Sequence, residues 1–436
     1  MFEKVKNAFK VKDIRSKLFF TFLMLIVVRL GSQLPVPGTD RTYFSNWFAQ
    51  QSRDSFGFLN AFTGGSFENM SIFALNITPY ITSSIIMQLL TIAIPKLEEM
   101  QKEGEDGRKK IASITRYVTV GLALFESTAM AIGFGRQGLL EKYNALNVIT
   151  VIAALTAGSA FLMWIGEKIT EHGIGNGISI VLIINIIASM PQDFTSLFGQ
   201  FVSGKSFATG FLALCILAAV VIGTIVLTVI LNGAERRIPV QYAKKIQGRK
   251  TYGGQSSHIP LKVNTSGVIP IIFASSIMQL PVIMSSFFPQ KPGVWQTVLS
   301  VLSSSHWFNP TNWGYSVGAL IYAALVIFFA YFYTSITFNP MEVAENMKKQ
   351  GGFIPGIRPG KPTNEYLTKI LNYIVFIGAV GLIIVAMVPI VCNGLFKASV
   401  SFGGTSLIII VSVILETMKQ VESLMLVRNY KGFLND

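Results

Sequence analysis

Residues 76–90 read NITPYITSSIIMQLL, and residues 267–280, GVIPIIFASSIMQL, repeat the same pattern in the second half of the chain. Each copy has a proline, then a Ser-Ser pair four or five residues later, then an apolar run that ends in Met-Gln-Leu. Proline disfavours the interior of a helix, so it is an unusual residue for a plain membrane span. The repeat indicates that both halves of the chain need this pattern for a shared purpose.

The composition is that of a membrane protein. Of 436 residues, 51% are hydrophobic and 13% are charged, whereas soluble domains carry about 25% charged residues. The two cysteines, Cys215 and Cys392, lie in or beside apolar runs and predict no disulfide. The three histidines are scattered, so we expect neither a metal site nor a cofactor.

Ten segments are long and apolar enough to cross a bilayer, which takes about 20 residues. The predicted spans are Leu18–Leu34, Ile72–Ile94, Val118–Gly135, Val148–Ile165, Ile178–Phe201, Phe211–Leu231, Val268–Phe288, Trp313–Phe338, Ile370–Val391 and Ala398–Leu415. Most of the 36 lysine and arginine residues fall in the segments on one side. By the positive-inside rule, that side and both termini are cytosolic.

The quoted repeat occupies the second and the seventh predicted span, which are the second of the first five and the second of the last five. An odd number of spans per copy inverts the second copy, so the sequence predicts an all-α membrane protein of two inverted five-helix halves. Chance recurrence of a short apolar pattern is the alternative. The halves would comprise residues 18–201 and 202–422, between a basic arm (1–17) and a tail (423–436).

Two long cytosolic loops, 233–266 and 339–364, follow spans six and eight. We expect both helices to extend into the cytosol, with a turn at each tip. The stretch 351–363, GGFIPGIRPGKPT, alternates glycine and proline around Arg358, which favours a rigid loop that presents a docking charge over a solvated one. Basic residues of 243–264 could attract anionic lipid, RNA or an acidic protein face; they are Lys244, Lys245, Arg249 and Lys250.

No catalytic constellation stands out, so we expect no enzyme. GIGNG at 173–177 lacks the strand and the lysine of a phosphate-binding loop, and reads as a glycine turn that opens span five. Glu126 is the only acid near the middle of a span, which disfavours an ion-driven carrier. Arg29 lies near the outer end of span one, where its side chain can snorkel.

Polar side chains lie on the repeated apolar stretches: Ser83, Ser84, Gln88, Ser275, Ser276 and Gln279. They could be ordinary polar contacts between packed helices. They could also form a weak seam that opens between the halves. Just before the first copy, 56–71 reads FGFLNAFTGGSFENMS. This is either an external loop or a re-entrant segment inside the protein.

Several stretches together resemble the SecY family of protein-conducting channels, in its bacterial branch, over nearly the whole chain. They are SIFALNITPYITSSIIMQLL (71–90), EGEDGRKKIASITRY (103–117), EHGIGNGISI (171–180), AERRIPVQYAKK (234–245), QSSHIPLKVNTSGVIPIIFASSIM (255–278), GGFIPGIRPGKPT (351–363) and SFGGTSLIIIVSV (401–413). The resemblance implies two halves that clamp an hourglass pore in the bacterial cell membrane.

In that family a ring of aliphatic side chains pinches the pore. By position in the matched motifs the ring would be Ile77, Ile81, Ile178, Leu182, Ile272 and Ile409. Pro79 and Pro270 would bend the helices near it. Asn76 and Thr78 flank Ile77, and either would weaken ion exclusion if its side chain faced the pore.

The resemblance also implies a plug helix at about 58–71, called here the plug segment. Its named residues are Phe58, Leu59, Phe62, Gly64, Gly65 and Phe67. The six polar positions of the repeat would line a lateral gate through which membrane segments leave. Arg358 and the four basic residues of 243–264 would dock the motor SecA or the ribosome. SecE, SecG, signal-bearing preproteins and membrane lipids are the other implied partners. A secondary transporter of a small solute remains the alternative.

Overall fold

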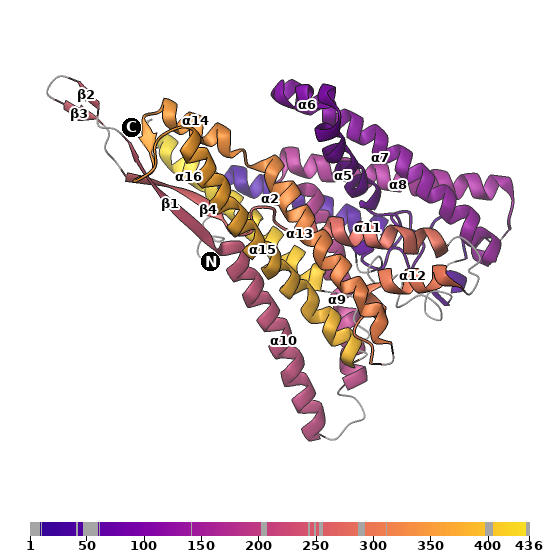
Figure 1. The fold of residues 1–436 in the computed structure, drawn as a ribbon. Coiled ribbons are helices and arrows are strands. Elements are labelled where there is room, and N and C mark those ends of the chain that lie inside the picture. The colour runs from indigo at the N-terminus through magenta and orange to yellow at the C-terminus, as the bar shows by residue number, and fades with distance from the viewer. Residues whose placement is uncertain are drawn as a thin grey trace.

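A computed structural model describes residues 9, 11–40, 42–46, 60, 62–140, 142–201, 207–242, 245–247, 250–252, 256–286, 293–310, 312–396 and 404–432. The fold is mostly helical (Figure 1). Its longer helices run over Lys12–Gly31 (α2), Thr78–Ala93 (α5), Pro95–Lys102 (α6), Glu105–Phe134 (α7), Ala145–His172 (α8), Gly177–Phe201 (α9), Phe207–Gly233 (α10), Ile269–Ser286 (α11), Val294–Leu302 (α12), Val317–Thr337 (α13), Pro340–Lys349 (α14), Lys361–Phe396 (α15) and Gly404–Gly432 (α16).

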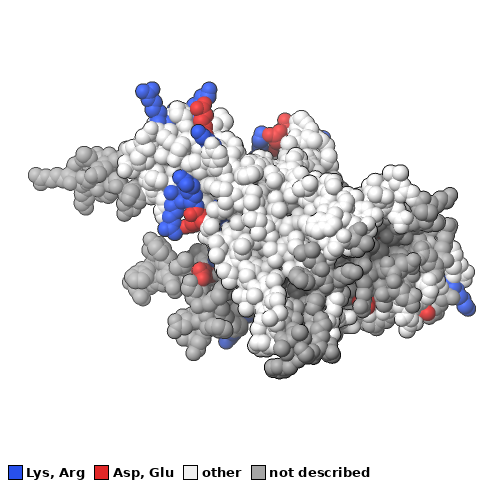
Figure 2. All heavy atoms as spheres, turned by 60° about the horizontal axis from the view of Figure 1, so that its bottom comes forward, with Lys and Arg blue, Asp and Glu red and all other residues white. Residues whose placement is uncertain are grey.

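Each of the ten predicted spans coincides with a helix. Among the described residues, six helices are long and apolar enough by themselves to cross a membrane, and the pair α5 and α6 makes a seventh if it is counted as one span bent by 100°. The other three predicted spans are occupied by α2, α11 and α16. On the face drawn in Figure 2, most of the described surface is uncharged and the charged side chains lie toward its margins.

The helices pack in two groups that follow the two predicted halves. Helices α2, α5, α7, α8 and α9 contact one another, and so do α10, α11, α13, α15 and α16. Helix α9 also contacts α10 and α16, and thus joins the groups. Each group has its own apolar core, one around Phe134 and Leu155 and the other around Val326 and Leu382.

The prolines of the repeated stretch start helices and do not bend them. Pro79 is in the first turn of α5, and Pro270 is the second residue of α11. Proline suits this position because the first backbone N–H groups of a helix have no partner within the helix. The expected bend near the pore is therefore wrong. The bend lies at Pro95, which follows the extended residue Ile94 and starts α6.

The loop 233–266 is a second departure from expectation. Helix α10 ends at Gly233, and Glu235–Tyr242 (β1) then pairs antiparallel with Ser256–Lys262 (β4). Gly352–Phe353 (β5) adds to β1, giving the order β4-β1-β5. Lys245–Gln247 (β2) and Lys250–Tyr252 (β3) form a hairpin beyond the tip of this ribbon (Figure 1). Span six is thus extended by strands, whereas span eight is followed by helix α14, as expected of a helical extension.

The glycine turn at 173–177 opens α9, as predicted. Gly175 has a φ of +80°, and α9 begins at Gly177. Asn176 caps this helix, because its side-chain oxygen accepts from the backbone N–H groups of Ile178 and Ser179. The backbone N–H of Ile174 donates to Thr21 Oγ1, which ties the turn to α2.

Candidate pore and gate

Four of the six predicted ring residues meet in one apolar cluster. Ile81 comes from α5, Leu182 from α9, Ile272 from α11 and Ile409 from α16, so both groups of helices contribute. Leu182 and Ile409 are buried, while Ile81 and Ile272 are half-buried at its margin. Phe62 of the plug segment is buried in the same cluster. The four side chains and Phe62 therefore pack together in one apolar cluster between the two groups of helices.

The other two predicted ring residues lie in a neighbouring cluster. Ile77 is fully buried beside α8, in a group that also holds Ile178 and shares Ile81 with the ring cluster. The structure instead places Ile186 in the ring cluster. Ile186 is four residues after Leu182, so both lie on one face of α9. Ile178 and Leu182 have the same spacing, so spacing alone does not choose between the two pairs; the rotation of α9 about its axis does.

The plug segment is only partly the helix that the resemblance implies. Phe58 and Leu59 lie outside the described residues. Phe62 and Thr63 are helical, and the chain continues through turns at 64–70. Gly64 and Gly65 have φ angles of +63° and +81°. Phe67 is buried in the core around Phe134 and Leu155, where its ring meets that of Phe44 edge-on, with 5.5 Å between the ring centroids.

Asn76 turns its side chain to the plug segment. Its Nδ2 donates to the backbone carbonyl of Phe62 at 2.6 Å, and its Oδ1 accepts from Nδ2 of Asn185 on α9 at 3.1 Å. The backbone carbonyl of Asn76 accepts from Ser159 Oγ on α8. The amide that could have weakened ion exclusion at the ring is thus occupied by hydrogen bonds in this structure.

Arg29, near the end of α2, also faces the plug segment. Its guanidinium Nη1 lies 3.5 Å from the carbonyl oxygen of Gly64, and the side chain is half-buried. The expectation that this arginine simply snorkels to water therefore needs correction: its charged head is directed at the backbone of the plug segment. Two side chains from separate elements, Arg29 and Asn76, hold carbonyl groups of this segment.

The Ser-Ser pair of α5 does not form a polar seam between the halves. The hydroxyl oxygen of Ser83 lies 2.5 Å from that of Thr119 on α7, within the same group of helices, and both side chains are buried. Ser275 is buried, while Ser84, Gln88, Ser276 and Gln279 are half-buried. Within the described residues, no hydrogen bond joins any of these six positions to the opposite group.

Aliphatic side chains make the contact between the halves at this place. Ile85 of α5 is buried in one cluster with Ile271 and Met278 of α11, and Leu89 packs at its edge. Lipid tails are as apolar as these side chains, so separating such a contact into lipid costs little hydrophobic free energy. The described contact between α5 and α11 is therefore made by apolar side chains.

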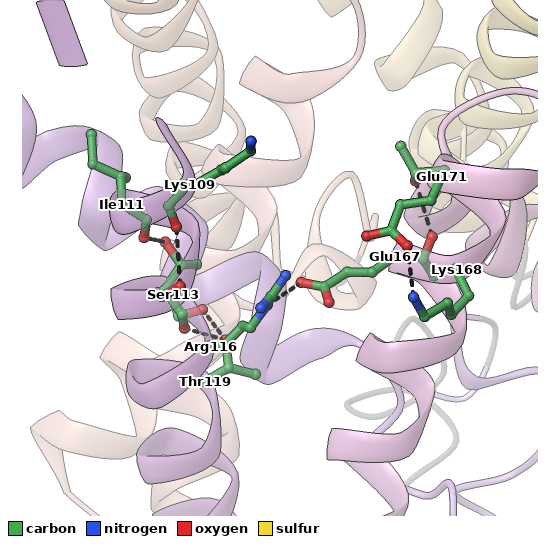
Figure 3. Close-up of polar contacts among 12 residues, drawn as sticks. Lys109, Ile111, Ser113, Arg116, Thr119, Glu167, Lys168 and Glu171 are labelled. Carbon is green, nitrogen blue, oxygen red and sulfur yellow. Dashed lines mark hydrogen bonds and ion pairs between the residues drawn. The ribbon is translucent and has the colours of Figure 1, made fainter. Parts of the chain in front are cut away.

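Arg116 and Glu167 connect α7 to α8 beyond the most apolar part of both helices (Figure 3). The Nε of Arg116 donates to Glu167 Oε1 at 2.7 Å. Lys168, the residue after Glu167, pairs with Glu171 one turn further along α8 at 2.7 Å. These ion pairs lie at the end of the helices where the sequence predicts the cytosol.

The expected docking residues fall around the β-ribbon and the loop after it. Arg358 is exposed, and its backbone carbonyl accepts from Thr363 Oγ1. Gly356 and Gly360, on either side of it, have φ angles of +83° and +103°, which fixes a glycine-dependent turn. Lys245 and Lys250 belong to the β2–β3 hairpin, and Lys244 and Arg249 lie outside the described residues.

Comparison with known proteins decides the family. A sequence model of SecY matches residues 71–418. The chain belongs to the SecY family. It is 43% identical to the protein translocase subunit SecY of Halalkalibacterium halodurans and 41% identical to that of Bacillus subtilis, with full coverage of this chain and of each relative. With full coverage, the matched region includes the ring cluster, the plug segment and the β-ribbon of this SecY-family chain.

Solved structures show the same fold. One, on the plug domain of the SecY protein and the closed state of its translocation channel, has a TM-score of 0.62 at 18% identity and covers 94% of this chain and 92% of its own. Sec61 in the canine ribosome-channel complex has a TM-score of 0.57 at 18% identity, with the same coverage. The SecY-family chain thus has the fold of protein-conducting channels.

Proposed function

We propose that this chain is the pore subunit of a bacterial translocase, which passes unfolded secretory polypeptides across the cell membrane. The observation that carries the proposal is the ring cluster. Ile81, Leu182, Ile272 and Ile409 converge from four helices of both halves, and Phe62 is buried in the same cluster. Relatives of the same length at 41–43% identity are named protein translocase subunits, which supports the same role here.

The ring explains how one opening could admit a polypeptide and exclude ions. A narrow apolar constriction loses its water, and an ion cannot pass without its hydration. Aliphatic side chains carry no fixed partners, so they can move apart around residues of any chemistry. Phe62 must leave the ring before a chain can enter. The plug segment would then be the closing element on the outer side.

Sideways release of transmembrane segments would use the contact between α5 and α11. This contact is formed by Ile85 and Leu89 on one side and Ile271 and Met278 on the other. When the halves part, these side chains would exchange contact with one another for contact with lipid tails, which are equally apolar. A hydrophobic segment in the pore could therefore replace that contact and continue into lipid. Ser84, Gln88, Ser276 and Gln279 would line the opened gate.

The proposed partners follow from the family and from exposed basic elements. SecA or the ribosome would dock on Arg358 and on the loop with Lys244, Lys245, Arg249 and Lys250. Solved relatives include channels bound to ribosomes. SecE would brace the two groups of helices, and SecG would bind at the periphery. The basic segments place both termini in the cytosol.

The competing function, a small-solute transporter, needs a few converging polar groups at its binding site. The four side chains that meet between the halves, Ile81, Leu182, Ile272 and Ile409, are aliphatic and offer no such groups, which favours the channel. The test is reconstitution of this chain with SecE in liposomes, with SecA, ATP and a secretory precursor added outside. Protease-protected precursor supports the channel, and its complete absence contradicts the proposal.

A further inference from the structure

Two buried carboxamides lie between the plug segment and α9. Asn76 is 1% exposed and Asn185 is 3% exposed. Asn185 donates to Asn76, and Asn76 donates in turn to the backbone carbonyl of Phe62. The three groups form a chain of hydrogen bonds that runs from α9 to the plug segment. Such a chain holds its members in one geometry, because each amide has only one arrangement that satisfies both neighbours.

Asn76 is itself held in a fixed position. Its φ is +52°, in the left-handed region, where asparagine is tolerated better than most residues other than glycine. Its N–H donates to the carbonyl of Phe73, and its own carbonyl accepts from Ser159 of α8. The side-chain amide therefore projects from a rigid turn, while its partner carbonyl belongs to a segment that has to move.

The hydrogen bond from Asn76 opposes the departure of Phe62 from the ring cluster. The ring of Phe62 is buried among the constriction side chains, and its carbonyl is held by Asn76. Withdrawal of the plug segment from the cluster therefore has to break this hydrogen bond. A buried bond made at 2.6 Å in an apolar setting is costly to leave unmade, so it favours the closed arrangement.

The hydrogen-bonded arrangement can also be reversed at limited cost, because one of its acceptor atoms has no partner in the described part of the chain. The Oδ1 atom of Asn185 is buried without a hydrogen-bond partner among the described residues. When the plug segment leaves, water that enters the outer funnel can bond both this oxygen and the freed amide of Asn76. The gain at Asn185 offsets part of the loss at Phe62.

We propose that Asn76 and Asn185 form an amide latch that sets how often the plug segment leaves the ring. Asn76 is the holding residue, and Asn185 is a positioning residue that orients the amide of Asn76 toward the carbonyl of Phe62. The inference rests on the proposed channel function, since it assigns the latch to the closing step. Its chemistry is that of neutral amides, so the latch does not depend on pH near neutrality.

The test uses the full chain in liposomes with a reporter at Ser66, which is 2% exposed in the plug segment. Ser66→Cys is introduced after Cys215→Ser and Cys392→Ser, and a membrane-impermeant maleimide is added on the outer side. Asn76→Gly removes the amide while tolerating the positive φ. We expect it to raise the labelling rate about tenfold, the effect of losing one buried hydrogen bond of typical strength. Ion leak from the liposomes should rise with it.

Asn185→Ala provides a second variant, with a smaller expected increase. In the double variant the two effects should not add, because both act on the same bond. Asn264→Ala is the matched control: Asn264 Nδ2 donates to Asn232 Oδ1 at 2.8 Å in the other half, so its loss destabilises the fold without touching the plug segment. Labelling at Ser66→Cys should stay at the parental rate.

The outcomes separate the latch from the channel. Parental labelling rates in both Asn76→Gly and Asn185→Ala, in a chain that still carries precursor, would overturn the latch and leave the channel function standing. A raised labelling rate in liposomes that never carry precursor would support the latch and contradict the channel. Equal increases in the Asn264→Ala control would reduce the effect to general instability and overturn the latch.

Discussion

A Cβ atom on Gly64 would stand 2.6 Å from the backbone carbonyl oxygen of Asn185, so the plug segment crosses α9 in direct backbone contact. Glycine is required here twice, since its φ of +63° is also one that side chains disfavour. The close approach puts the carbonyl of Gly64 within reach of Arg29. The backbone contact with α9 and the approach of Arg29 both hold the plug segment beside the ring cluster, although it consists mostly of turns.

Gly64→Ala should therefore displace the plug segment. The methyl group would meet backbone, which cannot rotate away, and the left-handed φ adds about 1 kcal/mol or more. We expect a severalfold rise in ion leak from reconstituted liposomes. Gly121→Ala on α7, where a Cβ meets nothing within 4 Å, is the control and should leave the leak unchanged. Equal leaks from both variants would contradict the close packing at Gly64.

The membership of the ring can be tested by comparing two isoleucines of α9. Ile186→Ser places a hydroxyl in the cluster with Phe62 and Ile409, and should increase ion leak because a polar group lets water remain in the constriction. Ile178→Ser alters the neighbouring cluster and should leave the leak near the parental level. Single-channel recordings in planar bilayers measure both. A larger leak from Ile178→Ser would restore the ring expected from sequence.

Arg358→Glu should abolish SecA-driven import of precursor while the chain still inserts and unfolds at the parental temperature. The side chain is exposed and its backbone is set by the glycines around it, so the reversal changes charge without disturbing packing. Lys361→Glu reverses a second exposed charge nearby and serves as the control. Normal import by Arg358→Glu would remove this residue from the docking role.

Glu167→Gln should destabilise the contact of α7 with α8 by less than about 1 kcal/mol, because the side chains of Arg116 and Glu167 are 46% and 23% exposed and water screens the pair. Thermal unfolding in detergent measures the loss, which should shrink at high salt. Lys102→Gln, which breaks the more exposed pair with Glu98, should have a smaller effect. A loss that salt does not change would point to packing and not to charge.

Asp40 carries the one pH dependence that we predict. Its Oδ1 accepts from Thr42 Oγ1 and from the N–H groups of Thr42 and Tyr43, and these bonds lower the pKa of the carboxyl. A lowered folded-state pKa contributes stability above the unfolded value of about 3.9 and loses it as the pH falls through the folded value. The contribution of Asp40 to stability should thus be flat from neutral pH to about 5 and should fall only at more acid pH.

The measurement is thermal unfolding in detergent from neutral to acid pH. Asp40→Asn keeps an acceptor oxygen but no titratable group, so its curve should lack the acid-side loss that Asp40 contributes. Identical acid profiles for the two chains would show that the bonds to Thr42 and Tyr43 carry no linkage.

The ten spans and the glycine turn before α9 could be predicted from the sequence. The length of an apolar segment and the distribution of positive charge around it are local properties of the chain. They predict a span because an apolar helix is stable in lipid wherever it lies in the bundle. The motifs shared with the family pointed to Ile81, Leu182, Ile272 and Ile409, and these four residues pack in one cluster. Proline signals, by contrast, could not distinguish a helix start from a bend.

What only the tertiary structure decided is the direction in which side chains point. Ile186 packs with Leu182 and Ile409 while Ile178 packs in the neighbouring cluster, because the rotation of α9 about its axis is set by its neighbours. Ser83 bonds Thr119 within one half for the same reason. The chain from Asn185 through Asn76 to Phe62 joins residues 109 and 14 positions apart in the sequence. No local pattern marks such a set, because each bond exists only once segments far apart in the sequence have packed together.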